Sequence, residues 1–179
     1  MIIILSGPIH SGKTTFLEKS LGRWSSRGLK FGGFLSIAVL NKSGETEYDL
    51  LDLKEGRRLP FLRTTGEPEW QRVGPFAFVP QAFEVARSLI LNADPSELLI
   101  VDEVGPLELG GGGLWPALMK VTQASVRRSL LVIREEILED FVGKLGTASP
   151  LIFDVRDPNI RLLLDGSLFG TQKLDDGQG

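Results

Sequence analysis

A short glycine-containing segment near the N-terminus carries the strongest chemical signal in this sequence. Residues 7–15 read GPIHSGKTT and match the spacing G-x-x-x-x-G-K-T of a phosphate-binding loop. Gly7 and Gly12 allow backbone angles that a Cβ would disfavour, so successive N–H groups can turn inward around phosphate oxygens. Lys13 supplies a positive charge for the β and γ phosphates, and the Thr14 hydroxyl can coordinate Mg²⁺. We therefore expect this segment to bind a nucleotide through its phosphates.

The sequence around the loop favours a genuine site over a chance match. Residues 1–6 (MIIILS) predict a buried strand and residues 14–24 a helix with an apolar face, which gives the strand–loop–helix order that the motif requires. His10 occupies a position that the motif leaves open, so we expect it to face solvent or a neighbouring segment rather than act as a ligand or base. The predicted nucleotide-binding residues of this segment are Gly7, Pro8, Ile9, His10, Ser11, Gly12, Lys13, Thr14 and Thr15.

An acidic pair follows an apolar run in the middle of the chain. Residues 98–101 (LLIV) predict a parallel strand covered on both faces, and Asp102 and Glu103 follow it directly. Opposite a phosphate-binding loop, an aspartate can hold Mg²⁺ alongside Thr14, and the next glutamate can polarise the attacking water. Taken alone, the pair could equally be two solvated acids at the start of a loop. With the loop, it predicts Thr14 and Asp102 as metal ligands and Glu103 and Lys13 as catalytic residues.

Three further features allow alternative interpretations. Glu108 can line the site or bond to the backbone of the turn at residues 105–109. Arg134 follows a core strand, where it can stabilise the transferring phosphoryl group or join a structural ion pair, and we favour the ion pair. Residues 110–113 are four consecutive glycines, which we interpret as a linker in preference to a nucleotide-responsive loop.

Length and composition restrict the class of protein. A chain of 179 residues with 42% hydrophobic residues predicts one folded domain at residues 1–169, followed by a frayed tail at residues 170–179. The net charge of −3 argues against a nucleic-acid partner bound through a general basic field. The absence of cysteine and the single histidine argue against disulfides, thiolate zinc sites and histidine triads. The apolar N-terminus lacks a basic leader, and no apolar run reaches membrane-spanning length, so we expect a soluble cytoplasmic protein with no membrane partner.

The elements that must position the site alternate between strand and helix. Strands are predicted at residues 1–6, 30–40, 46–53, 59–63, 73–79, 98–101, 129–133 and 151–155, the fifth as a short strand or extended turn. Helices are predicted at residues 14–24, 81–92, 115–125 and 137–145, with a final one beginning at 158–164. This order predicts a doubly wound α/β domain with a mainly parallel sheet and an inserted β-hairpin.

The two motifs together resemble the small nucleoside-triphosphatase family of the thermophile-type and cancer-related nucleoside triphosphatases. The resemblance rests on residues 7–15 and on residues 101–109 (VDEVGPLEL), in which Leu107 stands where the family usually has methionine. Residues 32–34 (GGF) and 73–76 (VGPF) also agree, and the resemblance extends from residue 1 to about 165. In contrast, relatives tend to carry a polar stretch where residues 36–39 (SIAV) are mostly apolar.

The resemblance implies a P-loop fold and a Mg²⁺-dependent hydrolysis of ATP, GTP and other nucleoside triphosphates to diphosphate and phosphate, with broad base tolerance. The resemblance also implies that the loop and a second block of residues bind the nucleotide. That block consists of Asp102, Glu103, Val104, Gly105, Pro106, Leu107 and Glu108.

Two other functions use the same loop. A small-molecule kinase needs an acceptor pocket and arginines to clamp the acceptor, and Arg57, Arg58 and Arg63 are candidates, although we favour solvated side chains for them. A nucleotide-dependent switch needs loops whose order changes with the γ-phosphate, with which residues 110–113 are compatible. The sequence does not define an oligomeric state.

Overall fold

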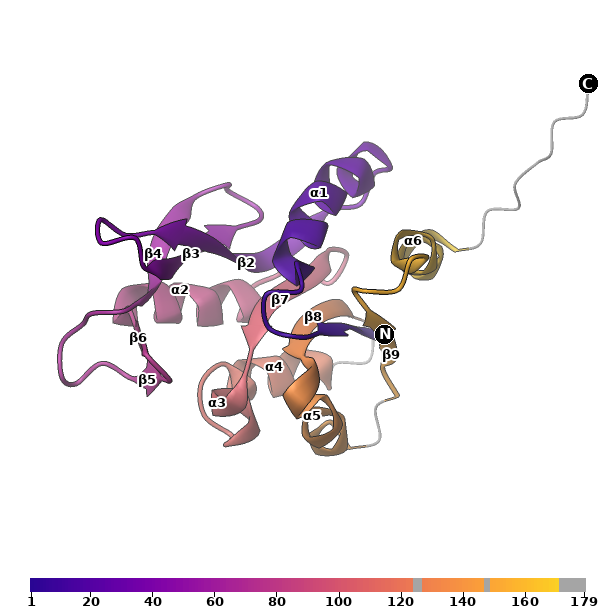
Figure 1. The fold of residues 1–179 in the computed structure, drawn as a ribbon. Coiled ribbons are helices and arrows are strands. Elements are labelled where there is room, and N and C mark those ends of the chain that lie inside the picture. Colours follow the sequence, from indigo (N-terminus) through magenta and orange to yellow (C-terminus); the bar gives the residue numbers. More distant parts are fainter. Residues whose placement is uncertain (124–126, 147–148, 171–179) are drawn as a thin grey trace, which may run out of the picture.

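The computed structural model describes residues 1–123, 127–146 and 149–170, with Glu103 described by its backbone (Figure 1). Within these residues, nine strands form one sheet in the order β5-β6-β4-β3-β2-β7-β8-β1-β9. The strands are β1 (Ile2–Gly7), β2 (Phe31–Leu40), β3 (Thr46–Asp52), β4 (Arg58–Arg63), β5 (Arg72–Val73), β6 (Phe76–Phe78), β7 (Leu98–Val104), β8 (Arg128–Arg134) and β9 (Leu151–Asp154).

The parallel half of the sheet positions the two sequence motifs. Strands β2, β7, β8, β1 and β9 are parallel neighbours, and the residues of β1 are all buried, as expected for a strand covered on both faces. Strand β8 separates β1 from β7, and its last residue, Arg134, pairs with Gly7. The carboxyl ends of the three strands therefore lie at one edge of the sheet, the edge where open α/β sheets bind ligands.

The antiparallel half is larger than the predicted hairpin. Strand β2 pairs with β7 over Phe31–Phe34 and with β3 from Phe34 onward, and β4, β6 and β5 then extend the sheet. Gly33, with φ +91°, lies at the crossing between the two halves, where a Cβ would collide with the carbonyl oxygen of Ile100. A residue with a side chain would push β2 away from β7, so glycine is required here.

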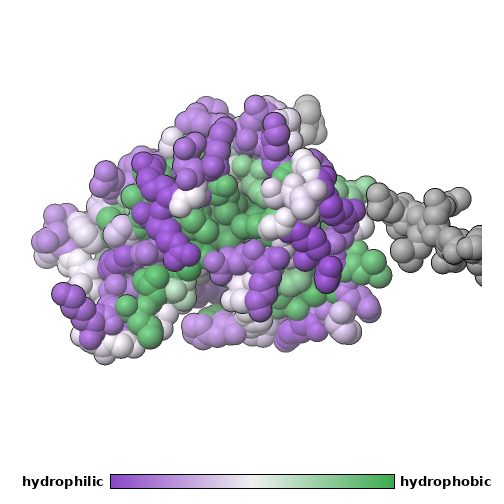
Figure 2. Space-filling model, turned by 90° about the horizontal axis from the view of Figure 1, so that it is seen from above, coloured by the Kyte–Doolittle hydropathy of each residue, from purple (hydrophilic) through white to green (hydrophobic). Residues whose placement is uncertain are grey.

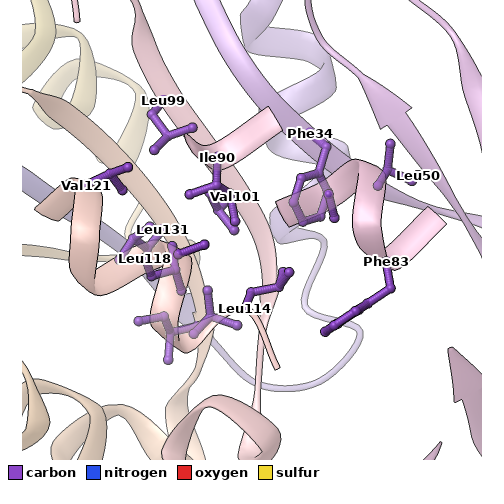
Figure 3. Close-up of a cluster of buried hydrophobic side chains, with 14 of the residues drawn as sticks. Phe34, Leu50, Phe83, Ile90, Leu99, Val101, Leu114, Leu118, Val121 and Leu131 are labelled. Atoms are coloured by element: carbon purple, nitrogen blue, oxygen red, sulfur yellow. The ribbon is translucent and has the colours of Figure 1, made fainter. Parts of the chain in front are cut away.

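Helices cover both faces of the sheet, which confirms the doubly wound α/β prediction. They are α1 (Lys13–Ser26), α2 (Pro80–Leu91), α3 (Pro106–Leu109), α4 (Trp115–Thr122), α5 (Leu138–Lys144) and α6 (Ile160–Phe169), with a 3₁₀ turn η1 (Glu135–Ile137) before α5. A large apolar cluster packs α2, α4 and α5 against one face, and it includes Ile90 and Leu118 of the helices with Val101 and Leu131 of the sheet (Figure 3). A second cluster packs α1 and α6 on the other face. From above, apolar residues gather in the middle of the visible surface, with polar residues around them (Figure 2).

Two local features differ from the sequence prediction. Helix α3 was expected to be a turn, because a single helical turn is too short to show apolar periodicity. Strand β7 continues to Val104, beyond the predicted end at 101, so Asp102 and Glu103 lie in the strand rather than after it. Helix α6 begins at Ile160, within the range predicted for its start, and runs to Phe169. Residues 171–179 of the frayed tail predicted at 170–179, and residues 124–125 at the end of the helix predicted at 115–125, fall outside the described residues.

A half-buried carboxylate joins the two helices on one face of the sheet. Asp165 of α6 accepts hydrogen bonds from Trp24 Nε1 at 2.7 Å and from Arg23 of α1 at 3.1 and 3.2 Å, and Arg27 lies 3.5 Å away. Burial alone would raise its pKa, but the hydrogen bonds from Arg23 and Trp24 and the two positive charges outweigh this, so the pKa of Asp165 is lowered from 3.8.

We expect Asp165→Ala to lower the free energy of unfolding at pH 7 by about 1–2 kcal/mol, because these charge-assisted hydrogen bonds are partly exposed to solvent. Since the folded pKa is depressed, the stabilisation is complete above pH 3.8, the value in the unfolded chain, and is lost as the pH falls through the folded pKa. Urea unfolding of both proteins between pH 7 and pH 2 tests this. An equal difference in stability at both ends of that range would contradict the role of the ionised carboxylate.

Candidate functional site

The loop between β1 and α1 has the backbone conformation that a phosphate cradle needs. Gly7 has φ +150° and Gly12 has φ +87°, and His10 also has a positive φ of 60°. A Cβ on Gly7 would approach Val155 Cγ1 to 2.8 Å and Ser11 Oγ to 2.9 Å, so only glycine fits there. Gly12 is the N-cap of α1, so the helix directs its positive end and its first N–H groups at the loop.

Lys13 lies across this loop. Its Nζ donates hydrogen bonds to the carbonyl oxygens of Gly7 at 2.8 Å and Pro8 at 2.6 Å. These bonds hold the ammonium at the mouth of the cradle, where phosphate oxygens can exchange for the carbonyls.

Thr14 and Asp102 bring the two sequence motifs together. Thr14 Oγ1 donates a hydrogen bond of 2.7 Å to Asp102 Oδ2, which also accepts one from the Ser36 backbone N–H at 3.2 Å. Asp102 is almost completely buried, at 2% exposure. A hydroxyl and a carboxylate at this spacing are hard oxygen donors, and Mg²⁺ is commonly held by one or two such groups together with substrate phosphates and water. The donor set at this point therefore fits Mg²⁺.

These residues surround a small pocket, which we call the loop pocket, of about 90 Å³. Its lining consists of Ile9, His10, Ser11, Gly12, Lys13, Tyr48, Asp102, Val104, Val132 and Arg134. Thr15 lies on the exposed side of α1, and Glu103 is described by its backbone only, next to Asp102 in β7. Lys13, Arg134 and the start of α1 make this pocket positive, with Asp102 as the acidic exception.

Three residues that line the loop pocket were not predicted to bind nucleotide: Tyr48, Val132 and Arg134. Tyr48 comes from β3, in the antiparallel half, and no motif marks it in the sequence. For Arg134, the sequence favours a structural ion pair over a role at the phosphoryl group. The structure places it in the loop pocket at the carboxyl end of β8, which lies between β1 and β7. The position of Arg134 at the end of a predicted core strand was a sequence signal for its place in the pocket. The place of Tyr48 depends on how far β3 extends along β2, which the sequence does not show.

The apolar stretch at residues 36–39 also reaches the site. Its contribution is the backbone N–H of Ser36, which binds the Asp102 carboxylate. Because the contact uses a backbone N–H, it does not require a polar side chain, so the mostly apolar residues at 36–39 do not disrupt it.

Asp154, at the end of β9, adds a fixed negative charge near the loop. Hydrogen bonds from Arg156, with a smaller contribution from the charge of Lys13, lower the pKa of Asp154 to about 2. Arg156 also pairs with Glu135 at 2.7 Å. Asp154 therefore stays ionised at neutral pH.

Glu108 holds the segment that follows the Asp102 strand. Its Oε2 accepts the Gly105 N–H and its Oε1 accepts the Leu114 N–H, both at 2.9 Å, and the side chain is 3% exposed. Gly113, with φ +59°, packs so closely on this carboxylate that a Cβ would collide with it. Of the two roles considered for Glu108, the geometry supports the bond to backbone. It also gives one glycine of the 110–113 run a specific packing role.

Lys144 completes this arrangement from the neighbouring helix. Its Nζ donates to the carbonyl oxygen of Glu108 at 2.9 Å and to that of Leu109, at the end of α3. The ammonium also lies 4.4 Å from the centre of the Trp115 ring. A positive charge at the carboxyl end of a helix stabilises the last carbonyl groups.

We expect Glu108→Gln to lower the free energy of unfolding by about 1–3 kcal/mol, because an amide cannot accept both backbone N–H groups and its own NH₂ group would face one of them. Glu84→Gln is the matched control, since Glu84 is an exposed residue of α2 paired only with Arg87 in the contacts described. Urea unfolding measures both. Equal stability of the two variants would contradict the clamping role.

A sheet with a parallel half, a phosphate-binding loop after its first strand, and an aspartate hydrogen-bonded to the loop threonine define a P-loop nucleotide-binding protein. Residues 2–165 match the model of the family described as NTPase, and the chain belongs to that family. The resemblance inferred from the motifs is thereby confirmed. Among the described residues, no helix combines the length and the apolar character needed to cross a membrane.

Similar proteins carry names that agree with the assignment to this family. The nucleoside-triphosphatase THEP1 of Thermofilum pendens is 32% identical over 119 residues, which cover 65% of this chain and 65% of that protein. The cancer-related nucleoside-triphosphatase homolog of Mus musculus is 31% identical over 118 residues, covering 60% of this chain and 61% of that protein. The chain thus matches just under two thirds of the length of these relatives, both of which are named nucleoside-triphosphatases.

Two solved structures share the fold. The solution structure of a human cancer-related nucleoside triphosphatase superimposes with a TM-score of 0.72 at 24% identity, covering 96% of this chain and 98% of that one. The crystal structure of THEP1 from Aquifex aeolicus gives a TM-score of 0.71 at 20% identity, with coverage of 96% and 100%. The described architecture is therefore that of the family.

Proposed function

We propose that this protein hydrolyses nucleoside triphosphates to the diphosphate and phosphate in a Mg²⁺-dependent reaction. The observation that carries the proposal is the 2.7 Å hydrogen bond between Thr14 and Asp102, which joins residues 88 positions apart beside the phosphate-binding loop. The membership of the NTPase family and the names of the relatives support it.

The residues divide the work of phosphoryl transfer to water. The N–H groups of the loop, the start of α1 and Lys13 bind the β and γ phosphates and stabilise the charge that develops on them. Thr14 and Asp102 would hold Mg²⁺, which offsets the phosphate charge when bound. Glu103, the next residue of β7, orients the attacking water and accepts its proton. The guanidinium of Arg134 faces the same pocket and adds positive charge.

ATP and GTP are the proposed substrates, with little discrimination between bases. Discrimination requires a pocket whose polar groups are left unpaired by the wrong base. The residues of the loop pocket are those of phosphate binding, and the sequence lacks an Asn-Lys-x-Asp run for guanine, since residues 41–44 read NKSG. We expect kcat/KM values for ATP and GTP within about tenfold, or about 1.4 kcal/mol. Initial rates of both at several concentrations measure this, and a hundredfold preference would reveal a base pocket.

The test of the activity is phosphate release by the purified protein from ATP, GTP, CTP and UTP, with Mg²⁺ and with EDTA. Release with Mg²⁺ and its loss with EDTA support the proposal. Thr14→Ala serves as the variant that removes one proposed ligand while leaving Lys13 in place. Tight triphosphate binding without turnover in the wild type would instead favour a nucleotide-dependent switch.

A further inference from the structure

A second and larger pocket adjoins the loop pocket. It has a volume of about 220 Å³, against about 90 Å³ for the loop pocket. Tyr48 and Arg134 line both spaces, so the second pocket begins where the site for the phosphates ends. We call it the aromatic pocket.

The walls of the aromatic pocket are mostly apolar. Phe76, Phe78 and Val73 come from β5 and β6 at the end of the antiparallel half, and Leu107 comes from α3 on the opposite side. The rings of Tyr48 and Phe76 are 5.4 Å apart and nearly perpendicular, at 80°. Such edge-to-face walls suit a flat ring, because the ring can place its faces and edges against aromatic groups in the same geometry.

Hydrolysis alone does not need this space. The attacking nucleophile is one water molecule, whose share of liquid volume is about 30 Å³, and apolar walls give it few hydrogen-bond partners. For comparison, an apolar cavity of about 150 Å³ binds benzene in another protein. The aromatic pocket therefore has the size and character of a site for a small ring.

The charges at the entrance of the aromatic pocket restrict which polar group such a ligand can carry there. If the loop pocket holds a triphosphate, as the proposed function states, an anionic group beside it would be repelled by the phosphates. The phenol of Tyr48 and the guanidinium of Arg134 can hydrogen-bond to an uncharged hydroxyl at this point.

We propose that the aromatic pocket binds a second small molecule, an uncharged six-membered ring that carries a hydroxyl group. The ring lies among Val73, Phe76 and Leu107, and the hydroxyl lies at Tyr48 and Arg134, next to the terminal phosphate. The placement of the hydroxyl rests on the proposed nucleotide site, whereas binding of the ring does not.

Binding is tested with benzyl alcohol and the ¹⁵N-labelled protein without nucleotide. We expect a dissociation constant of about 1–10 mM, typical of a ligand with so few atoms, and shifts of the backbone amides of Gly74, Gly105 and Leu107. Val73→Trp fills the pocket and should weaken binding about tenfold or more by steric exclusion. Leu107→Trp does the same from the opposite wall and is the second variant should the first fail to fold.

Leu40→Trp is the matched control, because Leu40 is 74% exposed at the end of β2 and lines neither pocket. It should bind benzyl alcohol like the wild type. Shifts confined to other residues, or equal binding by the folded pocket-filling variants, would overturn the proposal.

The position of the hydroxyl is tested with a non-hydrolysable triphosphate analogue and Mg²⁺ present. Benzyl alcohol should bind as before, whereas benzoate should bind about tenfold more weakly than it does without the analogue, because of charge repulsion. Equal benzoate binding with and without bound analogue would refute this orientation. Because the first titration contains no nucleotide, the loss of the hydrolase proposal would leave its result intact.

Discussion

Replacing Glu103 by glutamine is expected to lower the turnover of ATP by about 10²–10⁴, the usual contribution of a positioned general base or water orienter. Glutamine keeps the size of the side chain but removes the charge that accepts a proton. The Mg²⁺–ATP affinity should change little, because the proposed metal ligands are Thr14 and Asp102. Single-turnover phosphate release gives the rate and calorimetry gives the affinity.

Asp102→Asn is the comparison that makes this result specific. Asp102 is buried and receives hydrogen bonds from Thr14 and from the Ser36 backbone, so its loss should weaken the Mg²⁺ dependence of binding as well as slow turnover. Two solvated acids would not give different phenotypes at neighbouring positions. If Glu103→Gln hydrolyses ATP within about threefold of the wild type, Glu103 is not the catalytic residue.

The second large effect concerns binding. Lys13→Ala should lower the affinity for triphosphate tenfold or more, because a hydrogen bond from a charged donor to phosphate contributes about 1.5–3 kcal/mol net. Lys13 is already held at the loop by the carbonyl groups of Gly7 and Pro8, so little conformational freedom is lost when phosphate binds.

Calorimetric titration with a non-hydrolysable ATP analogue measures this loss. Lys19→Ala is the matched control, because Lys19 is an exposed residue of the same helix and should leave affinity unchanged. Circular dichroism checks that both variants fold. A folded Lys13→Ala protein with wild-type affinity would remove the basis for assigning the loop to phosphate binding.

The parallel half of the fold was accessible from the sequence, because its strands are continuous apolar runs separated by helical patterns. In the antiparallel half, the hairpin and a strand at 59–63 were predicted, but residues 73–79 were expected to form a single short strand or extended turn. Strands β5 and β6 have two and three residues, too few to show an alternating pattern, and their pairing with β4 is decided by contacts distant in sequence. For β3 and β4, the observed bounds lie within one residue of the strands predicted at 46–53 and 59–63.

The same distinction applies to the site. Spacing and residue type predicted the loop and Asp102, and the meeting of strand ends explains why Thr14 and Asp102 touch. Tyr48 could not be found in this way, because its place depends on the register between β2 and β3. For Arg63, held by Asp49 and by Glu47 at 3.3 Å, the structure shows an ion-paired role in the sheet rather than an acceptor clamp.

The position of β1 between β8 and β9 has a consequence for biosynthesis. Ile2 pairs with Ser129 and Ile3 with Leu151, so β1 gains its sheet neighbours only after the much later segments that form β8 and β9 have been synthesised. Closing such long loops is entropically costly, and sheets with distant pairings fold slowly. The loop after β1 is thus synthesised well before the strands on either side of β1, and until those strands pair with it the apolar β1 sequence is exposed surface of the kind that chaperones protect.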